Sequence, residues 1–324
     1  MKIGIYSITY RGIWYQGKAL DVFSLLRLAK EQGWEAVELD TERPHAAPMD
    51  LSPDDRKRLR DLSGELNLPI CAISPNSDFS SPSPSHREAM LCYTRECIKM
   101  ARDLGAPICK IFAAWRGVTL HHGLASYDLT YGQDPYPYWK ADRRGFVVDS
   151  LRELCQFAED NGVVLALQNH GPDIVNNYRD VLSLIQEVAS PVLKASMDLN
   201  IDENTESAEH ARQMVKDSGK LLVHSHVNGE FRRNPDGSVA LAGAGYWDAG
   251  FWGRKTAYPA YIKALVESGF EGCVDWEYCH PATENGKPAG IEYVHEQTRM
   301  ALEYLRKLRA DASVGSRRKA GQNI

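Results

Sequence analysis

The sequence predicts an α/β protein that forms a single (β/α)8 TIM barrel, with long loops after the fourth and seventh strands. Short apolar segments alternate with longer amphipathic segments, the alternation occurs eight times, and no linker divides the chain. The 324 residues exceed the roughly 250 of an ordinary barrel, which leaves room for insertions. We expect residues 1–308 to form the barrel and residues 309–324, a polar tail with Gly and Ser, to be disordered.

The eight predicted strands are short apolar runs that end at a polar or turn-forming residue. They cover residues 3–8, 36–39, 69–74, 108–112, 163–169, 193–198, 221–227 and 272–277. The fifth is typical of the set. Val163–Leu167 is wholly apolar, as in a strand buried on both faces, and Gly171-Pro172 then prevents its continuation.

The predicted helices have apolar residues at three- and four-residue spacing. They cover residues 20–32, a segment opened by 52–55, and residues 85–104, 146–161, 178–188, 206–218, 258–268 and 291–308. Ser52 has the position of an N-cap, because Pro53 suits the first turn of a helix. Ser85–Glu88 has the spacing of a capping box, and Gly33 and Gly105 stand where helices end.

Two long connections, 113–143 and 228–256, follow the fourth and seventh strands and are rich in aromatic residues. Loops longer than about 12–15 residues in a compact domain are usually functional. The carboxyl ends of the strands form the active-site rim of such barrels, so both connections are expected beside the site.

Composition excludes several function classes. The net charge of −5 provides no positive footprint for nucleic acid, and no apolar run is long enough to span a membrane. No signal peptide is evident, and the seven cysteines are scattered without a CxxC pair. We therefore expect a cytoplasmic protein with reduced thiols, without nucleic-acid or membrane partners.

Four consecutive predicted strands carry a polar side chain at the same height, at or next to their carboxyl ends: Gln168, Asp198, His226 and Glu277. Consecutive barrel strands are neighbours, so inward-pointing residues at one height converge. A single strand-end residue is ordinarily a satisfied rim residue, but four on successive strands favour a metal site. Three oxygen donors and one imidazole suit one divalent cation, Mn²⁺ first and then Mg²⁺ or Co²⁺, rather than structural zinc.

This pattern resembles the xylose isomerase-like barrel superfamily, the sugar isomerase/epimerase group, over nearly the whole chain. The resemblance implies Glu, Asp, His and Glu as the four ligands, and Asp198, His226 and Glu277 match. Gln168 departs from the pattern, as does Ile201, where several members carry His. An amide oxygen can bind a metal but cannot take a proton, so Gln168 removes one of the two bases of a ketose epimerase.

Three stretches, Gln168–Pro172, Glu277–Pro281 and Gly290–Gln297, together with the aromatic loop, look like the large subunit of bacterial C-glycoside deglycosidases. That resemblance implies a metal-dependent carbon–carbon lyase. It would abstract a proton beside the ketone of a 3-oxo-glucoside and release the aglycone by β-elimination. It also implies a small partner subunit, and we expect the protein to be an oligomer.

The remaining site residues are expected to handle protons or bind the carbohydrate. The candidate bases are Glu277, His170 and one of His121 or His122; the candidate hydroxyl binders are Asn169, His224, Glu230 and Arg232; and an apolar lid would include Trp115 and Trp247, with Trp139 and Trp252. His224 has the alternative role of holding another ligand, and His122 that of an ordinary exposed loop residue.

Two other functions remain possible, and a third is argued against by the composition. One is a sugar isomerase or epimerase acting on a free ketose or aldose. Another is a catalytically degenerate sugar or inositol binder, with Gln168 as the mark of lost activity. The abasic-site endonucleases that share the barrel need a histidine-rich zinc cluster and a basic groove, and the net charge of −5 argues against them.

Overall fold

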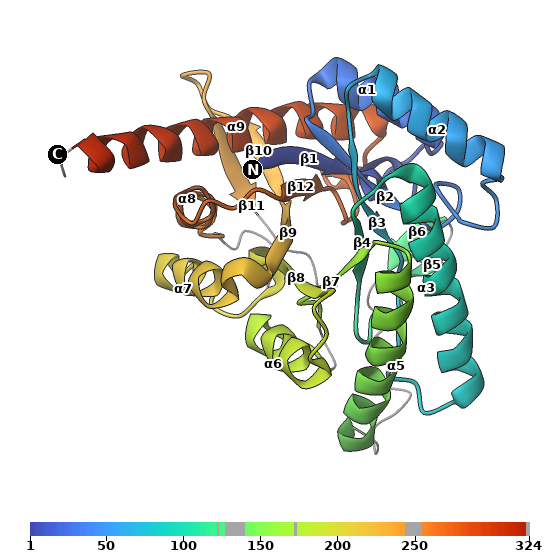
Figure 1. The fold of residues 1–324 in the computed structure, drawn as a ribbon. Helices are drawn as coiled ribbons and strands as arrows, with labels where there is room; N and C mark the ends of the chain where they lie inside the picture. Colours follow the sequence, from blue (N-terminus) through green and yellow to red (C-terminus); the bar gives the residue numbers. More distant parts are fainter. Residues whose placement is uncertain (122, 127–139, 172–173, 244–254, 322–324) are drawn as a thin grey trace.

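The computed structural model describes residues 1–324 except 122, 127–139, 172–173, 244–254 and 322–324. Eight parallel strands form a closed barrel in the order β1-β12-β9-β8-β7-β4-β3-β2 (Figure 1), which confirms the predicted fold class. The barrel strands are β1 (Lys2–Tyr6), β2 (Ala36–Asp40), β3 (Ile70–Ser74), β4 (Ile108–Ile111), β7 (Val164–Gln168), β8 (Leu193–Asp198), β9 (Leu222–Asn228) and β12 (Cys273–Glu277).

Helices surround the barrel and bury their apolar faces against it. They are α1 (Val22–Gln32), α2 (Pro53–Glu65), α3 (Pro84–Leu104), α5 (Lys140–Asp160), α6 (Tyr178–Val188), α7 (Ala208–Ser218), α8 (Tyr258–Glu267) and α9 (Ile291–Gly321). In the described parts of the chain, short 3₁₀ helices lie between strands and helices: η1 (Ser7–Tyr10) after β1, η2 (Leu199–Ile201) after β8 and η3 (Gly219–Leu221) before β9. Within the described residues, no helix combines the length and the apolar character that a bilayer crossing requires.

Helix termini follow the predicted residues in part. Ser52 caps α2 by accepting a hydrogen bond from the Asp55 amide at 3.1 Å. The predicted capping box at Ser85 is wrong, because α3 begins one residue earlier at Pro84, with Ser83 at the N-cap. Proline needs no amide partner and its φ already suits the first turn, so it starts the helix there.

The C-terminal helix is longer than the sequence predicts. Residues 309–324 were expected to be disordered, but α9 continues to Gly321. Arg309 forms a two-pronged ion pair with Glu35 at 2.6 Å, and Ala312 is buried. These contacts anchor the helix beyond Leu308, which explains why the polar composition was misleading.

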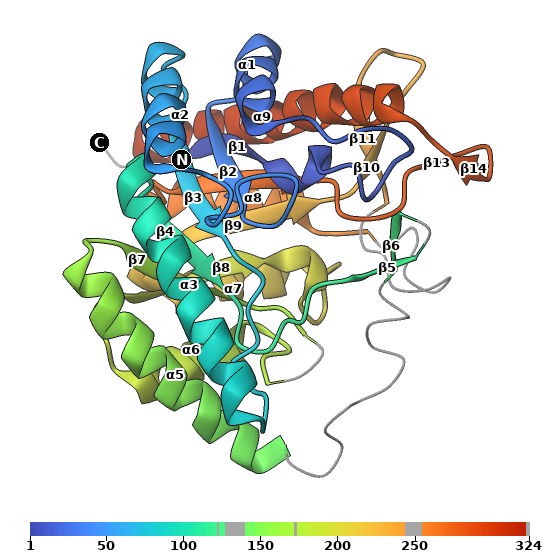
Figure 2. The ribbon, with the colours of Figure 1, turned by 90° about the vertical axis from the view of Figure 1, so that its right-hand side faces the viewer.

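Hairpins occur in both long connections and in the loop after β12. β5 (Thr119–His121) pairs with β6 (Leu124–Ser126), β10 (Glu230–Arg233) with β11 (Val239–Gly243), and β13 (Thr283–Glu284) with β14 (Lys287–Pro288). Figure 2 shows all three hairpins at the same end of the barrel, because each follows the carboxyl end of a barrel strand.

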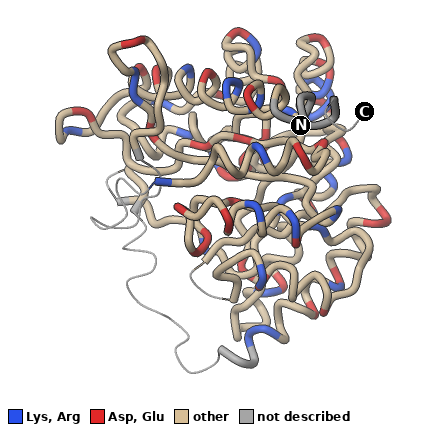
Figure 3. Tube along the Cα trace, turned by 90° about the vertical axis from the view of Figure 1, so that its left-hand side faces the viewer, with Lys and Arg blue, Asp and Glu red and all other residues tan. Residues whose placement is uncertain are grey.

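The buried part of the molecule has two regions of different chemical character. An apolar core fills the space between strands and helices, whereas the barrel interior is unusually polar: Glu38, Ser74, Lys110, Ser196, His224, His226 and Asp275 are all buried. Acidic and basic residues are interspersed on the outer face shown in Figure 3. Exposed ion pairs such as Arg144–Glu187 contribute only about 0–1 kcal/mol each, so the apolar core carries the stability.

Gly4 on β1 makes room for this polar interior. A Cβ atom at position 4 would lie 1.8 Å from Asp275 Oδ1 and 3.1 Å from the Ala36 carbonyl oxygen. We expect Gly4→Ala to destabilise the protein by about 1–3 kcal/mol through overpacking, measured by urea denaturation. Gly64→Ala is the control, since no atom lies within 4 Å of that position in α2, and it should stabilise by about 0.5–1 kcal/mol. Equal stability of Gly4→Ala and wild type would contradict the tight fit.

Candidate metal centre

Four barrel strands bring the predicted ligands to one end of the barrel. Gln168 ends β7, Asp198 ends β8 and Glu277 ends β12, while His226 lies two residues before the end of β9. In the β8–β9 register, Asp198 is paired directly with His226. The closed barrel therefore places all four residues at the carboxyl ends of neighbouring strands.

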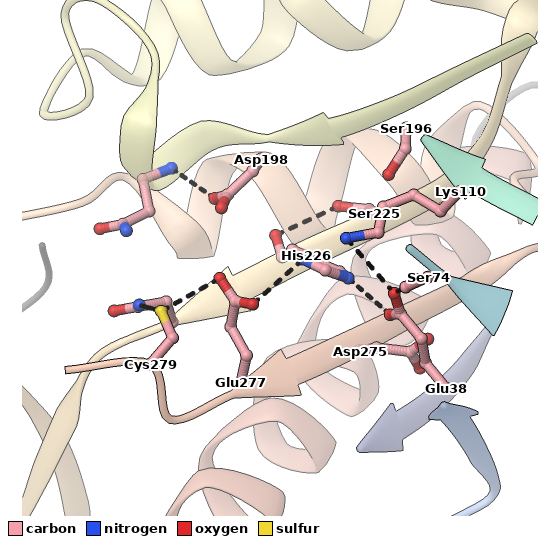
Figure 4. Close-up of polar contacts among 12 residues, drawn as sticks. Glu38, Ser74, Lys110, Ser196, Asp198, Ser225, His226, Asp275, Glu277 and Cys279 are labelled. Carbon is pink, nitrogen blue, oxygen red and sulfur yellow. Dashed lines mark hydrogen bonds and ion pairs between the residues drawn. The ribbon is translucent and has the colours of Figure 1, made fainter. Parts of the chain in front are cut away.

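Three of the four side chains form a compact buried cluster. Ligand atoms of Asp198, His226 and Glu277 lie within 4.8 Å of one another, and His226 Nδ1 is 3.4 Å from Glu277 Oε2. Figure 4 shows the carboxylates of Asp198 and Glu277 on one side of the imidazole ring. This is the side on which a cation would be bound.

The hydrogen bonds that are missing around this cluster fit a cation. Gln168 Oε1, Asp198 Oδ2 and His226 Nδ1 are buried and make no hydrogen bond among the described residues. Buried polar atoms are rarely left unsatisfied. Asp198 Oδ2 and His226 Nδ1 lie beside the Glu277 carboxylate, and Gln168 Oε1 is at the end of the neighbouring strand β7. Once His226 loses its ring proton, these groups offer the donor set of a hard or borderline divalent ion.

The electrostatics of the cluster also favour a positive ion. Burial, and then the charge of Glu277, raise the pKa of Asp198 to about 8. Burial acts to lower the pKa of His226, but the Glu38 carboxylate opposes it and the pKa rises to about 9. Two buried carboxylates that face each other are costly unless a cation lies between them. A divalent ion would relieve this repulsion and displace the proton from His226.

Sequence reasoning missed the residues directly beneath the cluster. Glu38 of β2 lies against the far side of the His226 ring, with Oε2 at 2.5 Å from Nε2. Lys110 of β4 lies 3.6 Å from Glu38 Oε1. Neither residue follows a strand-end pattern. The detectable signal was a charged residue inside each of two otherwise apolar strands, which such a strand tolerates only with a partner.

Two predicted hydroxyl binders are committed elsewhere. Asn169 donates to the Asp198 carbonyl at 2.9 Å and to Asp202 Oδ2 at 2.7 Å, and accepts from the Asp198 amide at 2.7 Å. His224 lies one layer below His226, between Ser196 Oγ at 3.0 Å and Asp275 Oδ2 at 2.8 Å. Asn169 therefore fixes the backbone of a ligand, and His224 holds the barrel interior together.

His170 and Trp115 lie together beside the cluster. Their ring centroids are 3.8 Å apart, and Phe112 contacts His170 edge-on at 5.1 Å. Burial lowers the pKa of His170 to about 4, so its imidazole is neutral near pH 7. The Nδ1 atom lies 2.9 Å from the Gly171 carbonyl, which assigns the proton to Nδ1 and leaves Nε2 as an acceptor.

The remaining predicted residues divide into two groups. Glu230 on β10 accepts hydrogen bonds from Tyr278 at 2.6 Å and Tyr293 at 3.0 Å, whereas Arg232 on the same strand is exposed. The lid residue Trp247 and the candidate base His122 lie outside the described residues, as do Trp139 and Trp252.

Comparisons with known proteins agree on one family. A sequence profile described as "Xylose isomerase-like TIM barrel" matches residues 26–308. Fructoselysine 3-epimerase from Shigella flexneri is 26% identical over 216 residues, which are 64% of this chain and 71% of that protein. The protein of the same name from Escherichia coli O157:H7 matches to the same extent.

Solved structures show the same fold at low sequence identity. D-psicose 3-epimerase in the presence of D-fructose matches with a TM-score of 0.70 and 16% identity, covering 95% of this chain and 99% of that one. The apo form of 3-keto-D-glucoside 4-epimerase from E. coli matches with a TM-score of 0.65 and 18% identity, with the same coverage. The narrower resemblance to C-glycoside deglycosidases stays a prediction.

A divalent cation should stabilise the folded protein. At 100 times its Kd, a bound ion contributes about 2.7 kcal/mol, so we expect Mn²⁺ to raise Tm and a chelator to reverse the rise. Asp198→Asn should abolish most of this response in a thermal melt. Glu203→Gln, in the separate cluster of Asp202, Glu203 and His210, should keep it. Loss of the response in Glu203→Gln alone would place the ion in that other cluster.

His224 should make stability depend on pH. Burial acts to lower its pKa, but Glu38 and Asp275 raise it from 6.5 to about 10. The charged form is favoured in the folded state, so its contribution is complete below pH 6.5 and is lost progressively as pH rises toward 10. In chelator, the stability advantage of wild type over His224→Gln in urea denaturation should therefore shrink between pH 7 and 9.5. An advantage that grows over this range would contradict the assignment.

Proposed function

Because the chain belongs to the xylose isomerase-like TIM barrel family, we propose that it is a metal-dependent enzyme that epimerises or isomerises a keto-sugar. The reaction would begin with removal of the proton on the carbon next to a carbonyl. One observation carries this proposal: three unsatisfied buried donor atoms, on Gln168, Asp198 and His226, lie at the barrel rim with the Glu277 carboxylate. The epimerase relatives support the same class.

Gln168, Asp198, His226 and Glu277 would hold the cation, and the donor set favours Mn²⁺ among Mn²⁺, Mg²⁺ and Co²⁺. When bound, a divalent ion polarises the substrate carbonyl and stabilises the negative charge that develops on its oxygen. The protein supplies an environment without competing water, since Asp198 and His226 are fully buried.

Glu277 is the proposed base. Burial acts to raise its pKa, but the neighbouring His226 lowers it, so the carboxylate is ionised at neutral pH. Its side chain is 11% exposed, whereas those of Asp198 and His226 are sealed from solvent. Glu277 is therefore the carboxylate of this cluster that a substrate can reach from the rim.

The fate of the proton depends on Gln168, which cannot accept one. An aldose–ketose isomerisation needs no second base, because Glu277 can return the proton to the neighbouring carbon on the same face. An epimerisation needs a carrier on the opposite face. We assign this role to His170, which lies two residues beyond Gln168 and whose buried imidazole is neutral near pH 7.

A second candidate function is β-elimination from a 3-oxo-glucoside, with release of the aglycone. Gln168 favours it, because only one base is needed to remove the proton beside the ketone, and Glu277 supplies that base. A carbon–carbon double bond then forms next to the ketone as the bond to the aglycone breaks, and the released aglycone carbon takes up a proton from solvent. The similarity in fold to a protein that acts on 3-keto-D-glucosides makes this substrate class worth testing. A requirement for a small partner subunit belongs to this candidate.

Deuterium exchange tests the proposal. The Mn²⁺-loaded protein is incubated in D₂O with fructoselysine, D-fructose and a 3-keto-D-glucoside, and ¹H NMR follows the proton beside each carbonyl. We expect exchange with one of these sugars and a second sugar as product. Glu277→Gln should slow exchange by about 10²–10⁴-fold through loss of the base. Gln168→Glu should speed any epimerisation, because it restores a second carboxylate.

Each outcome separates the candidates. Free aglycone from the 3-keto-glucoside, identified by chromatography, would favour the eliminating lyase. Tight Mn²⁺ binding with no exchange into any substrate would contradict an enzymatic function and favour a sugar binder.

A further inference from the structure

We propose that Glu38 on β2 is a positioning residue that turns Nδ1 of His226 toward the metal-ligand cluster. The inference rests on the proposed function only in requiring a divalent cation at that cluster. Strand β2 supplies none of the four proposed ligands and lies across the barrel from β8. With Glu38, the site therefore includes a residue from the opposite side of the barrel.

The contact between Glu38 and His226 determines which ring nitrogen faces the cation. Glu38 Oε2 lies 2.5 Å from His226 Nε2, and both side chains have no exposed surface. A carboxylate only accepts hydrogen bonds, so Nε2 must carry the proton. In the neutral ring, Nδ1 is then left with its lone pair, on the side of Asp198 and Glu277 (Figure 4). Carboxylates on the second nitrogen of a metal-bound histidine set its tautomer and orientation in this way.

Other buried groups hold the Glu38 carboxylate in place. Its Oε1 accepts a hydrogen bond from Ser74 Oγ and lies 3.6 Å from Lys110 Nζ, and Lys110 is only 1% exposed. Its Oε2 is also 3.4 Å from His224 Nε2. A buried carboxylate is stable only with such compensation. Strands β1 and β12 separate β2 from β9 in the barrel, so the contact between Glu38 and His226 crosses the barrel interior.

A purely structural role for Glu38 is the competing explanation, and Asp275 provides the matched control. Asp275 is also a fully buried carboxylate on a barrel strand, bonded to His224 Nε2 at 2.8 Å and to Cys71 Sγ at 3.0 Å. Among the described residues it makes no hydrogen bond to His226. Replacing Asp275 therefore disturbs the buried polar network around His224 but leaves the contact between Glu38 and His226 intact.

The test measures Mn²⁺ affinity by the EPR signal of the free ion at pH 7.5, in full-length wild type, Glu38→Ala, Glu38→Gln and Asp275→Asn. We expect Glu38→Ala to weaken binding about 10–100-fold. Glu38→Gln keeps an oxygen that can accept from Nε2, so it should retain more affinity than Glu38→Ala. Asp275→Asn should stay within about twofold of wild type, although its stability in urea falls.

A spectroscopic readout separates positioning from simple destabilisation. In protein loaded with diamagnetic Zn²⁺, ¹H–¹⁵N long-range NMR should show His226 protonated at Nε2 in wild type and in Glu38→Gln. If Glu38→Ala does not fold, the affinity and tautomer of Glu38→Gln decide the matter.

Several results would overturn the inference. These are wild-type affinity in a folded Glu38→Ala, equal losses in Glu38→Ala and Asp275→Asn, or coordination through Nε2 in wild type. None of these measurements uses a sugar. A weakened Mn²⁺ site in Glu38→Ala would thus support the positioning role even if the deuterium-exchange assay failed.

Discussion

Closure of the barrel is the constraint on which the rest of the molecule depends. The pairing of β1 with both β2 and β12 joins the two ends of the sheet. It gives residues that are remote in the chain a common interior, and Glu38 and His226, 188 positions apart, meet there. It also sets the carboxyl ends of β7, β8, β9 and β12 around one point. An open sheet with the same strands would give neither arrangement.

The interior of this barrel is organised for position rather than for apolar burial. Buried ions cost more in desolvation than their attraction commonly returns, so Glu38, Lys110, His224 and Asp275 are poor contributors to net stability. The apolar layer between strands and helices offsets that cost. These charged groups instead fix the positions of side chains. Glu38 contacts Lys110, His224 and His226, and Asp275 contacts His224 and Cys71. The contact with Glu38 holds the His226 ring in one orientation.

The sequence predicts the polar residues at the strand ends well, but it says much less about the polar residues deeper in the barrel interior. Gln168, Asp198 and Glu277 end apolar runs, and strand alternation predicts their direction, so the cluster could be predicted before the structure was known. His224 and His226 share that alternation, and the pattern does not tell which lies at the rim and which a layer below. Glu38 lies within a fully buried strand, and its charge there indicated only that it must have a buried partner. The local sequence does not identify that partner, because His226 is 188 positions away. The prediction of a disordered tail from residue 309 missed a distant partner in the same way, because Arg309 is held by Glu35, which lies near the other end of the sequence.

The most direct test of this account is an anomalous-difference map at the manganese edge from crystals of the protein soaked in Mn²⁺. We expect one strong peak at the barrel rim, coordinated by Gln168 Oε1, Asp198 Oδ2, His226 Nδ1 and Glu277. A peak bound instead by Asp202, Glu203 and His210, or coordination of His226 through Nε2, would contradict it.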